Sequence, residues 1–442
     1  MDSTNQTVTI IGGGLAGCEA AWQLATRGIN ISLYEMKPMR FSPAHKSAEM
    51  AELVCSNSFR SNDSFSAVGL LKDEMRHMAS LIIQTADQCS VPAGKALAVD
   101  RDQFASEITK KITNHPLITL FKEEISQLPP PSETPIILAT GPLTSDALAD
   151  SLAEITGADR LFFYDAIAPI IYADSLDSTI VYQKSRYDDG PGDYLNCPMD
   201  RSQYQNFIDE LARAEYTPLH SFENEKYFEG CLPIEVIRSR GDDTLRFGPM
   251  KPVGLENPAT GETPYAVVQL RKENQHGTLY NMVGFQTKLT YPEQKRIFRQ
   301  IPGLEGCEFA RLGSIHRNTF ICAPQILTPT LQLKVRPDIY ISGQLSGVEG
   351  YVESAAMGLL AGLNVAHALT GSGPVPPPAD TAMGALVAHL TQTESKQFQP
   401  SNINFGLFPP WQKKVPKKLR GKLRAEQALP SLASWYKNFS QA

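Results

Sequence analysis

The segment TVTIIGGGLAGCEAAWQLATRG, residues 7–28, decides the fold of this chain. Its first five residues are apolar or β-branched and predict a buried strand, and the glycines that follow predict a tight turn. The rest of the segment is rich in Ala and Leu and predicts a helix that Gly28 ends. INISLYE then predicts a second strand ending at Glu35. A strand, glycine turn, helix and second strand in this order begin a Rossmann-like α/β domain.

The spacing of the glycines in this turn is that of a dinucleotide-binding site. In Gly12-x-Gly14-x-x-Gly17, the first glycine permits the tight turn, the second lets the backbone approach a pyrophosphate, and the third lets helix and strand pack closely. Glu35 ends the next strand, where a carboxylate can accept hydrogen bonds from ribose hydroxyls. Further contacts are expected at the start of the helix, whose N–H groups can face phosphates, from Gly13, Leu15 and Ala16. A chance glycine turn in another α/β protein is the weaker alternative.

Two later segments favour FAD over NAD as the dinucleotide. IILATG places Gly141 directly after an apolar strand, and IYISGQLSGVEGY joins a strand, several glycines and a new helix. A helix that starts near residues 349–351 could direct its positive end at the flavin ring. The expected contacts here are Gly343, Gly350 and Tyr351. For this second segment alone, ordinary glycine-mediated helix packing explains the pattern equally well.

The predicted organisation is a Rossmann-like FAD-binding domain of the glutathione-reductase type, interrupted by a mixed α/β substrate domain. The FAD-binding parts are expected at residues 1–189 and 301–373, the inserted domain at 190–300, and a linker with a short helical basic segment at 374–442. Within the first part, VGLLKDEMRHMASLIIQTAD predicts a helical stretch. ALAVDRDQFASEITKKI predicts a strand, an Asp-capped turn and an amphipathic helix.

Composition bounds the class of protein. The 442 residues are 42% hydrophobic and 20% charged, which is ordinary for a globular chain. No apolar run reaches the length of about 18 residues that a membrane span needs, and the N-terminus has no signal-peptide pattern. Seven scattered cysteines without a CxxC pair predict a reduced cytoplasmic protein without disulfides or a metal site.

Two cysteines stand apart from the other five. Cys55 lies in ELVCSNSFRS among polar residues, whereas a structural cysteine normally has apolar neighbours, so a reactive thiol is predicted there. Cys231 lies in EGCLPIEV, where a packed thiol would be the preferred interpretation from the residues alone. Five cysteines have no supporting residues around them and are interpreted as structural: Cys18, Cys89, Cys197, Cys307 and Cys322.

Taken together, several motifs resemble one family closely. They are TIIGGGLAGCEAAWQLA, YEMKP, AELVCSNSFRS, EGCLPIEV, LRFGPMKPVGL, HRNTFI, GQLSGVEGYVES and NFGLFPP. The family is the folate- and FAD-dependent tRNA (uracil-5-)-methyltransferases, which are related to the larger GidA-type tRNA-modifying flavoproteins. The resemblance is weakest in residues 121–135 and in the last thirty or so residues.

The resemblance implies an activity. Such an enzyme makes 5-methyluridine at position 54 of the tRNA T-loop, with the carbon from 5,10-methylenetetrahydrofolate and the electrons from reduced FAD that NAD(P)H regenerates. Because only one GxGxxG motif is present, NAD(P)H is expected to visit the flavin without a domain of its own. In the family, the cysteines that match Cys55 and Cys231 both serve the reaction.

Carbon 5 of uracil becomes nucleophilic when a thiolate adds to carbon 6. We assign this addition to Cys231, because the cations that follow it could stabilise a thiolate and grip phosphate; they are Arg238, Arg240, Arg246 and Lys251. The expected substrate contacts are Arg238, Arg240 and Lys251. Cys55 is then expected near the flavin, as the base or acid at carbon 5 or as a shield for the flavin, and the reverse assignment stays open. His316, Arg317 and Asn318 are expected in the folate or flavin pocket, against an equal expectation that they only organise a turn.

The segment WQKKVPKKLRGKLR carries seven Lys or Arg and no acid, although the net charge of the chain is −6. A tRNA surface and a solvated helix face explain this run equally well. Three rival functions remain: a GidA-like modifier of wobble uridine, a flavin-bound RNA-binding protein without turnover, and a small-molecule flavin oxidoreductase. The oligomeric state and the choice between NADH and NADPH stay undetermined.

Overall fold

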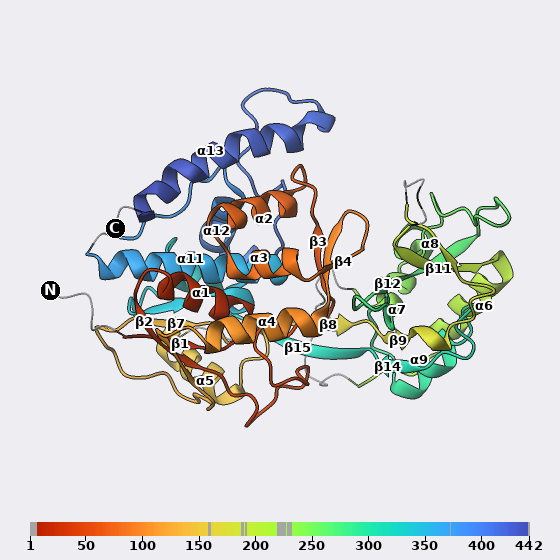
Figure 1. Ribbon diagram of the computed structural model, residues 1–442, viewed down its shortest axis with the longest axis horizontal. Coiled ribbons are helices and arrows are strands. Elements are labelled where there is room, and N and C mark those ends of the chain that lie inside the picture. The colour runs from red at the N-terminus through yellow and green to blue at the C-terminus, as the bar shows by residue number, and fades with distance from the viewer. Residues whose placement is uncertain are drawn as a thin grey trace.

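The computed structural model describes residues 7–157, 161–186, 190, 192–218, 227, 232–371 and 373–440. Two lobes are visible, with the N-terminal glycine turn in the larger first lobe (Figure 1). The first lobe contains a five-stranded sheet in which every pairing is parallel. In spatial order its strands are β16 (Ile339–Ile341), β7 (Ile136–Leu138), β1 (Thr7–Ile11), β2 (Asn30–Tyr34) and β6 (Ile118–Phe121). The predicted Rossmann-like α/β fold is thereby confirmed at the level of the parallel sheet.

Helices cover both faces of this sheet. Helices α1 (Leu15–Ala25) and α11 (Tyr351–Leu369) lie above it in Figure 1, and α5 (Asp146–Thr156) lies below it. Close packing of α1 on α11 requires glycine in α11, because a Cβ at Gly358 would lie 2.2 Å from the carbonyl oxygen of Ala16. Polar residues such as Glu353 and Asn364 interrupt the α11 sequence, so it is not a continuous apolar run. Within the described residues, α11 is nevertheless the one helix long and apolar enough to cross a membrane, and 89% of its apolar window is buried in the protein core.

The predicted helical stretch after residue 66 is two helices. Helix α2 (Ala67–His77) ends before Ala79, whose φ is +54°, and α3 (Leu81–Gln88) begins after Ser80. Ser80 caps α3 by accepting from the N–H of Ile83, and its hydroxyl donates to the buried carboxylate of Glu19. The predicted strand, Asp cap and helix that follow are confirmed: β5 (Ala96–Val99), then Asp100 as the cap, then α4 (Arg101–Thr113). Strand β5 lies between two short strands, β3 (Ser58–Ser61) and β4 (Ser90–Val91).

The second lobe has its own sheet and core. Its antiparallel sheet has, in order, β10 (Tyr182–Gln183), β11 (Tyr194–Met199), β12 (Ala266–Lys272), β13 (Leu279–Met282), β9 (Ile170–Tyr172) and β14 (Phe309–Arg311). Its helices are α6 (Arg201–Ala212), α7 (Ile234–Ser239), α8 (Thr244–Phe247) and α9 (Tyr291–Phe298). This sheet draws strands from residues 170 to 311, a wider span than the 190–300 expected for the inserted domain.

An antiparallel strand pair runs between the lobes. Strand β8 (Leu161–Ile167) leads into the second lobe and pairs with β15 (Ser314–Phe320), which returns to the first. A short helix, α10 (Ala323–Ile326), follows β15.

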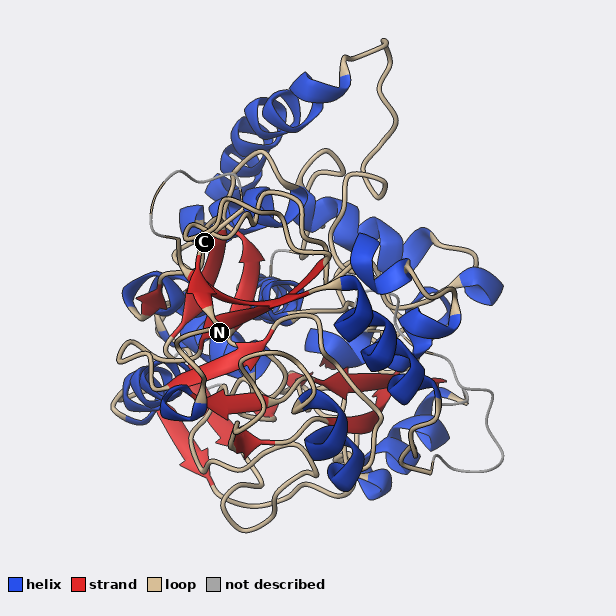
Figure 2. Cartoon of the chain, turned by 90° about the vertical axis from the view of Figure 1, so that its right-hand side faces the viewer, coloured by secondary structure: helices blue, strands red, loops and turns tan. Residues whose placement is uncertain are grey.

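The C-terminal region packs on the first lobe. The N-terminus of α12 (Ala382–Gln392) donates two backbone N–H groups to the carboxylate of Glu74 in α2. The last helix, α13 (Arg420–Ser440), stands at the top of the molecule in Figures 1 and 2. Its apolar side chains join the core of the first lobe, among them Leu432, Trp435 and Phe439. The C-terminal helices are therefore docked on the first lobe.

Candidate cofactor and catalytic site

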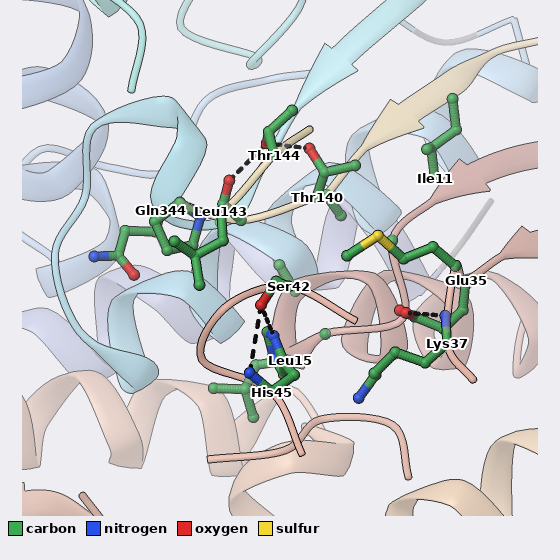
Figure 3. Close-up of a pocket in the computed structure, with 18 of the residues that line it drawn as sticks. Ile11, Leu15, Glu35, Lys37, Ser42, His45, Thr140, Leu143, Thr144 and Gln344 are labelled. Carbon is green, nitrogen blue, oxygen red and sulfur yellow. Dashed lines mark hydrogen bonds between the residues drawn. The ribbon is translucent and has the colours of Figure 1, made fainter. Parts of the chain in front are cut away.

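A large cavity opens at the carboxyl ends of β1, β2 and β7. After β1 the chain continues to β2 on one side of the sheet, whereas β7 pairs on the other side, so the cavity lies at the topological switch point where α/β sheets bind ligands. Its volume is about 1120 Å³, including the open space at its mouth. Figure 3 shows lining side chains that approach it from separate segments, including Glu35 and Lys37 after β2, Thr140 and Thr144 after β7, and Gln344 after β16.

The glycine turn forms one wall of this cavity. Gly12 has φ +107°, and a Cβ on it would lie 2.5 Å from the carbonyl oxygen of Ala139. A Cβ on Gly17 would lie 1.8 Å from the carbonyl oxygen of Gly12. A Cβ on Gly14 would meet no atom within 4 Å, and Gly14 lines the cavity. Gly12 and Gly17 are thus needed for packing of the protein itself, while Gly14 leaves a space that a phosphate group fits.

Glu35 is held at the end of β2 beside this wall. One carboxylate oxygen accepts from the N–H of Gly13 at 2.7 Å, and the other accepts from the N–H of Lys37 at 3.0 Å. The carboxylate lines the cavity and is 8% exposed. An acid fixed at this place can bind the hydroxyls of a ribose.

The remaining predicted cofactor contacts take different positions. Leu15, Ala16, Gly141, Gly343 and Tyr351 line the cavity. Three others do not line it: Gly13, Gly17 and Gly350, on which a Cβ would lie 2.9, 1.8 and 2.5 Å from the nearest protein atom. Gly350 has φ +109° and immediately precedes α11, which begins at Tyr351 as expected.

Sequence reasoning missed the wall formed by the segment after β2. Ser42 and His45 line the cavity, and Ser42 Oγ lies 2.5 Å from His45 Nδ1 (Figure 3). Burial is the main cause that lowers the pKa of His45, followed by the charge of Lys37. Lys37 is buried, donates from Nζ to the carbonyl oxygen of Glu49 at 2.5 Å, and pairs with Glu52 at 3.6 Å. The signal for this wall in the sequence was the set of polar residues that follow the predicted strand ending at Glu35, because ligands bind at the carboxyl ends of parallel strands.

Cys55 lies next to the cavity. Its neighbour Val54 and the side chain of Tyr351 both line the cavity, and the hydroxyl of Tyr351 accepts from the N–H of Cys55 at 2.8 Å. Burial and then the charge of Asp165 raise the pKa of the Cys55 thiol to about 12, against the opposing charges of Arg311 and Arg101. At neutral pH this thiol is protonated, so its polar neighbours do not produce a resting thiolate.

The five cysteines interpreted as structural are all buried and free: Cys18, Cys89, Cys197, Cys307 and Cys322. Burial is the largest cause that raises the pKa of each of these thiols. Among the described residues, no group of His, Cys, Asp and Glu is arranged to hold a metal ion.

Cys231 lies outside the described residues, but its flanks are described. Tyr227 forms a bridge with Tyr164 of β8, and the N–H of Ile234 donates to the carbonyl oxygen of Gln286 at 2.8 Å. Tyr227 therefore lies against the strand pair between the lobes, and Ile234 begins α7 of the second lobe.

The basic side chains that follow Cys231 in the sequence differ in solvent exposure and in their contacts. Arg240 is exposed, Lys251 is half-buried, and Arg238 pairs with Asp242 at 3.2 Å. Arg246 packs over the ring of Tyr265 at 3.7 Å and donates to the carbonyl oxygen of that residue. Arg246 therefore stabilises the second lobe, although the sequence suggested that it could support a thiolate.

His316, Arg317 and Asn318 lie on β15, between the lobes, and none of them lines the cavity. His316 is paired in register with Asp165, and its ring contacts Ser314 Oγ at 2.9 Å. Arg317 packs over the ring of Phe162 at 3.4 Å, and Asn318 is 3% exposed. Their expected contact with folate or flavin stays a prediction.

The basic C-terminal run is mostly exposed. Arg424 is the exception: it is 5% exposed, donates to the carbonyl oxygen of Pro409, and packs over the ring of Trp411 at 4.0 Å. Arg424 therefore holds the C-terminal segment together. The exposed cations are Lys413, Lys414, Lys417, Lys418, Arg420 and Lys422.

Comparison with known proteins places this geometry in a family. The model of the family "Glucose inhibited division protein A" matches residues 7–373. A relative from Desulfotalea psychrophila is 64% identical, with 98% of each chain covered, and one from Geobacter sulfurreducens is 58% identical, with 97% of this chain and 98% of the relative covered. Both are named methylenetetrahydrofolate--tRNA-(uracil-5-)-methyltransferase TrmFO. The solved structure of Aquifex aeolicus GidA (form II crystal) shares the fold, with a TM-score of 0.71 at 16% identity over 99% of this chain and 74% of that one. This chain therefore belongs to the glucose inhibited division protein A family, together with the TrmFO methyltransferases.

Proposed function

We propose that this chain is a methylenetetrahydrofolate–tRNA-(uracil-5-)-methyltransferase. It makes 5-methyluridine at position 54 of the T-loop, with the carbon from 5,10-methylenetetrahydrofolate and reducing equivalents from NAD(P)H through FAD. The observation that carries the proposal is the 64% identity to a relative of this name over 98% of the chain. The cavity beside Cys55 supports it, because cofactor and thiol must meet at one place.

The residues around the cavity fit FAD. Gly14 leaves open space at the N-terminus of α1 for the pyrophosphate, and Glu35 is fixed where it can bind a ribose. Tyr351, at the N-terminus of α11, would lie beside the flavin end. When bound, reduced FAD supplies the hydride that converts the transferred carbon to a methyl group. NAD(P)H would reach the flavin through the open mouth of the cavity.

The chain's own residues activate the uracil. The thiolate of Cys231 adds to carbon 6, which makes carbon 5 an enolate carbon able to attack the methylene carbon. A base then removes the proton from carbon 5 as the folate nitrogen leaves the methylene carbon, and addition of the hydride to that carbon would expel the thiolate from carbon 6 and restore the ring. Arg238, Arg240 and Lys251 would hold the RNA phosphates near this step.

The thiol of Cys55 suits a different task. Because its pKa is raised to about 12, it is a neutral thiol at rest, which argues against Cys55 as the nucleophile. Cys55 would hold or pass the proton at carbon 5 or shield the cofactor. His316, Arg317 and Asn318 lie on β15, which pairs with β8, and the carbonyl oxygen of Ala166 in β8 lies 4.0 Å from the Cys55 sulfur. These three residues are proposed to contact folate or flavin.

One assay tests the function. The protein is incubated with an unmodified tRNA transcript, methylene-labelled 5,10-methylenetetrahydrofolate and NAD(P)H, and nucleosides are analysed by mass spectrometry. Labelled 5-methyluridine at position 54 is expected. Label that enters only from S-adenosylmethionine would contradict the proposal.

A GidA-like modification of wobble uridine is the second candidate, favoured by the family match over residues 7–373 and by the shared fold. A T-loop hairpin and an anticodon hairpin, offered in equal amounts, separate the two functions. Modification of the T-loop hairpin alone is expected. The proposed setting is the cytoplasm, where tRNA is available and thiols stay reduced.

A further inference from the structure

Cys55 belongs to the first lobe in sequence, yet a side chain of the second lobe binds its backbone. Arg311, the last residue of β14, donates from Nη1 to the carbonyl oxygen of Val54 at 2.8 Å. Its Nη2 donates to the carbonyl oxygen of Cys55 at 3.1 Å. The planar guanidinium thus binds two successive carbonyl groups, which a lysine cannot do in the same way.

A second arginine of the same lobe binds the next two residues. Arg271 of β12 donates from Nη2 to Ser56 Oγ at 2.7 Å and from Nε to Asn57 Oδ1 at 3.1 Å. The amide of Asn57 in turn donates to the carbonyl oxygen of Lys272 at 2.9 Å. Arg271 is 7% exposed and Asn57 is fully buried, so little water competes for these bonds.

The first lobe completes the arrangement. The hydroxyl of Tyr351 accepts from the backbone N–H groups of Cys55 and Ser56, at 2.8 and 3.1 Å. Arg101 of α4 donates to the carbonyl oxygen of Leu53 and pairs with Glu273, just after β12, at 2.7 Å. The first lobe therefore binds the N–H of Cys55, and the second lobe binds its carbonyl group. Because both sides of the backbone are held, the direction of the Cα–Cβ bond that leads to the sulfur is fixed.

We propose that Arg311 and Arg271 are positioning residues through which the second lobe sets the place and orientation of Cys55 at the cavity. The consequence for catalysis rests on the proposed role of Cys55. A misplacement of about 1 Å in such a group can lower a rate by about 100-fold.

Arg311→Lys tests the proposal, because it keeps the positive charge but loses the two-pronged donor. Arg271→Lys tests the second contact. Arg299→Lys is the matched control: Arg299 also lies in the second lobe and donates, from Nε and Nη2, to the carbonyl oxygen of Cys307 at 3.1 and 2.8 Å. Each protein is alkylated with iodoacetamide as the FAD-loaded form, and the modified peptides are followed by mass spectrometry.

In Arg311→Lys the alkylation of Cys55 should be about tenfold faster, because one charge-assisted bond no longer holds the segment closed. Alkylation of Cys18 and Cys307 should not change, and kcat should fall about tenfold while KM for tRNA stays within about twofold. Arg271→Lys should give a smaller change in the same direction, and Arg299→Lys should leave Cys55 unchanged.

The proposal would be overturned if Cys55 in Arg311→Lys were alkylated at the same rate as in wild type. Equal acceleration at every cysteine, or the same effect in Arg299→Lys, would also overturn it, because either result indicates general loosening of the lobe. Failure of the proposed function is seen separately: Cys55→Ala with full methylation would refute the role of Cys55 and leave the alkylation results valid.

Discussion

Replacing Gly14 by Ala should damage cofactor binding without damaging the protein. Gly14 precedes α1 with φ −76° and ψ −168°, a conformation that alanine adopts freely. A Cβ there would meet no protein atom within 4 Å. The apo-protein should therefore be as stable as wild type, or more stable by up to about 1 kcal/mol, because alanine restricts the unfolded chain.

Affinity for FAD should fall, because the methyl group occupies the space that the pyrophosphate needs. Loss of one charge-assisted hydrogen bond to a backbone N–H costs about 1.5–3 kcal/mol. The Kd for FAD should then rise about 10- to 150-fold. The measurement is a titration of apo-protein with FAD, followed by flavin fluorescence, together with thermal unfolding of the apo-protein.

Two other glycines make the experiment decisive. Gly306→Ala is the control, because Gly306 lies in the second lobe and a Cβ on it also meets nothing within 4 Å; it should leave both measurements unchanged. Gly17→Ala should destabilise even the apo-protein, since its Cβ would lie 1.8 Å from the carbonyl oxygen of Gly12. A folded Gly14→Ala protein with the wild-type Kd would refute the assignment of the pyrophosphate to this turn.

Three further outcomes are expected. A T-loop hairpin that contains 5-fluorouridine should form a covalent adduct with wild type and Cys55→Ala but not with Cys231→Ala; adduct formation by Cys231→Ala alone would reverse the two roles. The slope of the logarithm of the tRNA binding constant against the logarithm of the salt concentration should become less negative by about two to three when the exposed C-terminal cations are changed to Gln, if half of them contact phosphate. Identical slopes would mean that this run is a solvated surface. These cations are Lys413, Lys414, Lys417, Lys418, Arg420 and Lys422. Burial raises the pKa of Glu74 from 4.5 to about 8, so its contribution to folding is complete below about pH 4.5 and is lost as the pH rises through about 8. The free energy of unfolding, measured in urea at about pH 5 and at about pH 8, should therefore change less between the two pH values for Glu74→Gln than for wild type. An equal change in both proteins would contradict the raised pKa of Glu74.

Much of the first lobe could be predicted from the chain alone. The strand before Gly12, the helix after Gly14 and the strand that ends near Glu35 all appear, since their signals lie within about thirty neighbouring residues. The start of α11 at Tyr351 also appears, after a glycine whose φ of +109° other residues rarely adopt. By contrast, one predicted helical stretch is two helices, because Ser80 forms a cap and Glu19 binds the N–H groups of Leu81 and Ile82.

The contacts that individual charged residues make depend on partners outside their immediate sequence neighbourhood. By sequence, Arg424 belonged to the basic C-terminal run and Arg246 to the cations that follow Cys231, but the aromatic rings of Trp411 and Tyr265 bind them in the folded protein. The raised pKa of Cys55 follows from burial and then from the charge of Asp165, which lies 110 positions further along the chain, and not from its neighbours in sequence.

The sequence by itself determined the α/β class, the place of the glycine turn and the family, because periodicity, glycine spacing and motif identity are local properties of the chain. Only the tertiary structure decided which residues close the cavity and what holds Cys55. Arg311 and Cys55 are 256 positions apart, and the bond between them exists because β14 of one lobe packs against a loop of the other. No local pattern records such a contact, since its free energy comes from packing of the whole chain.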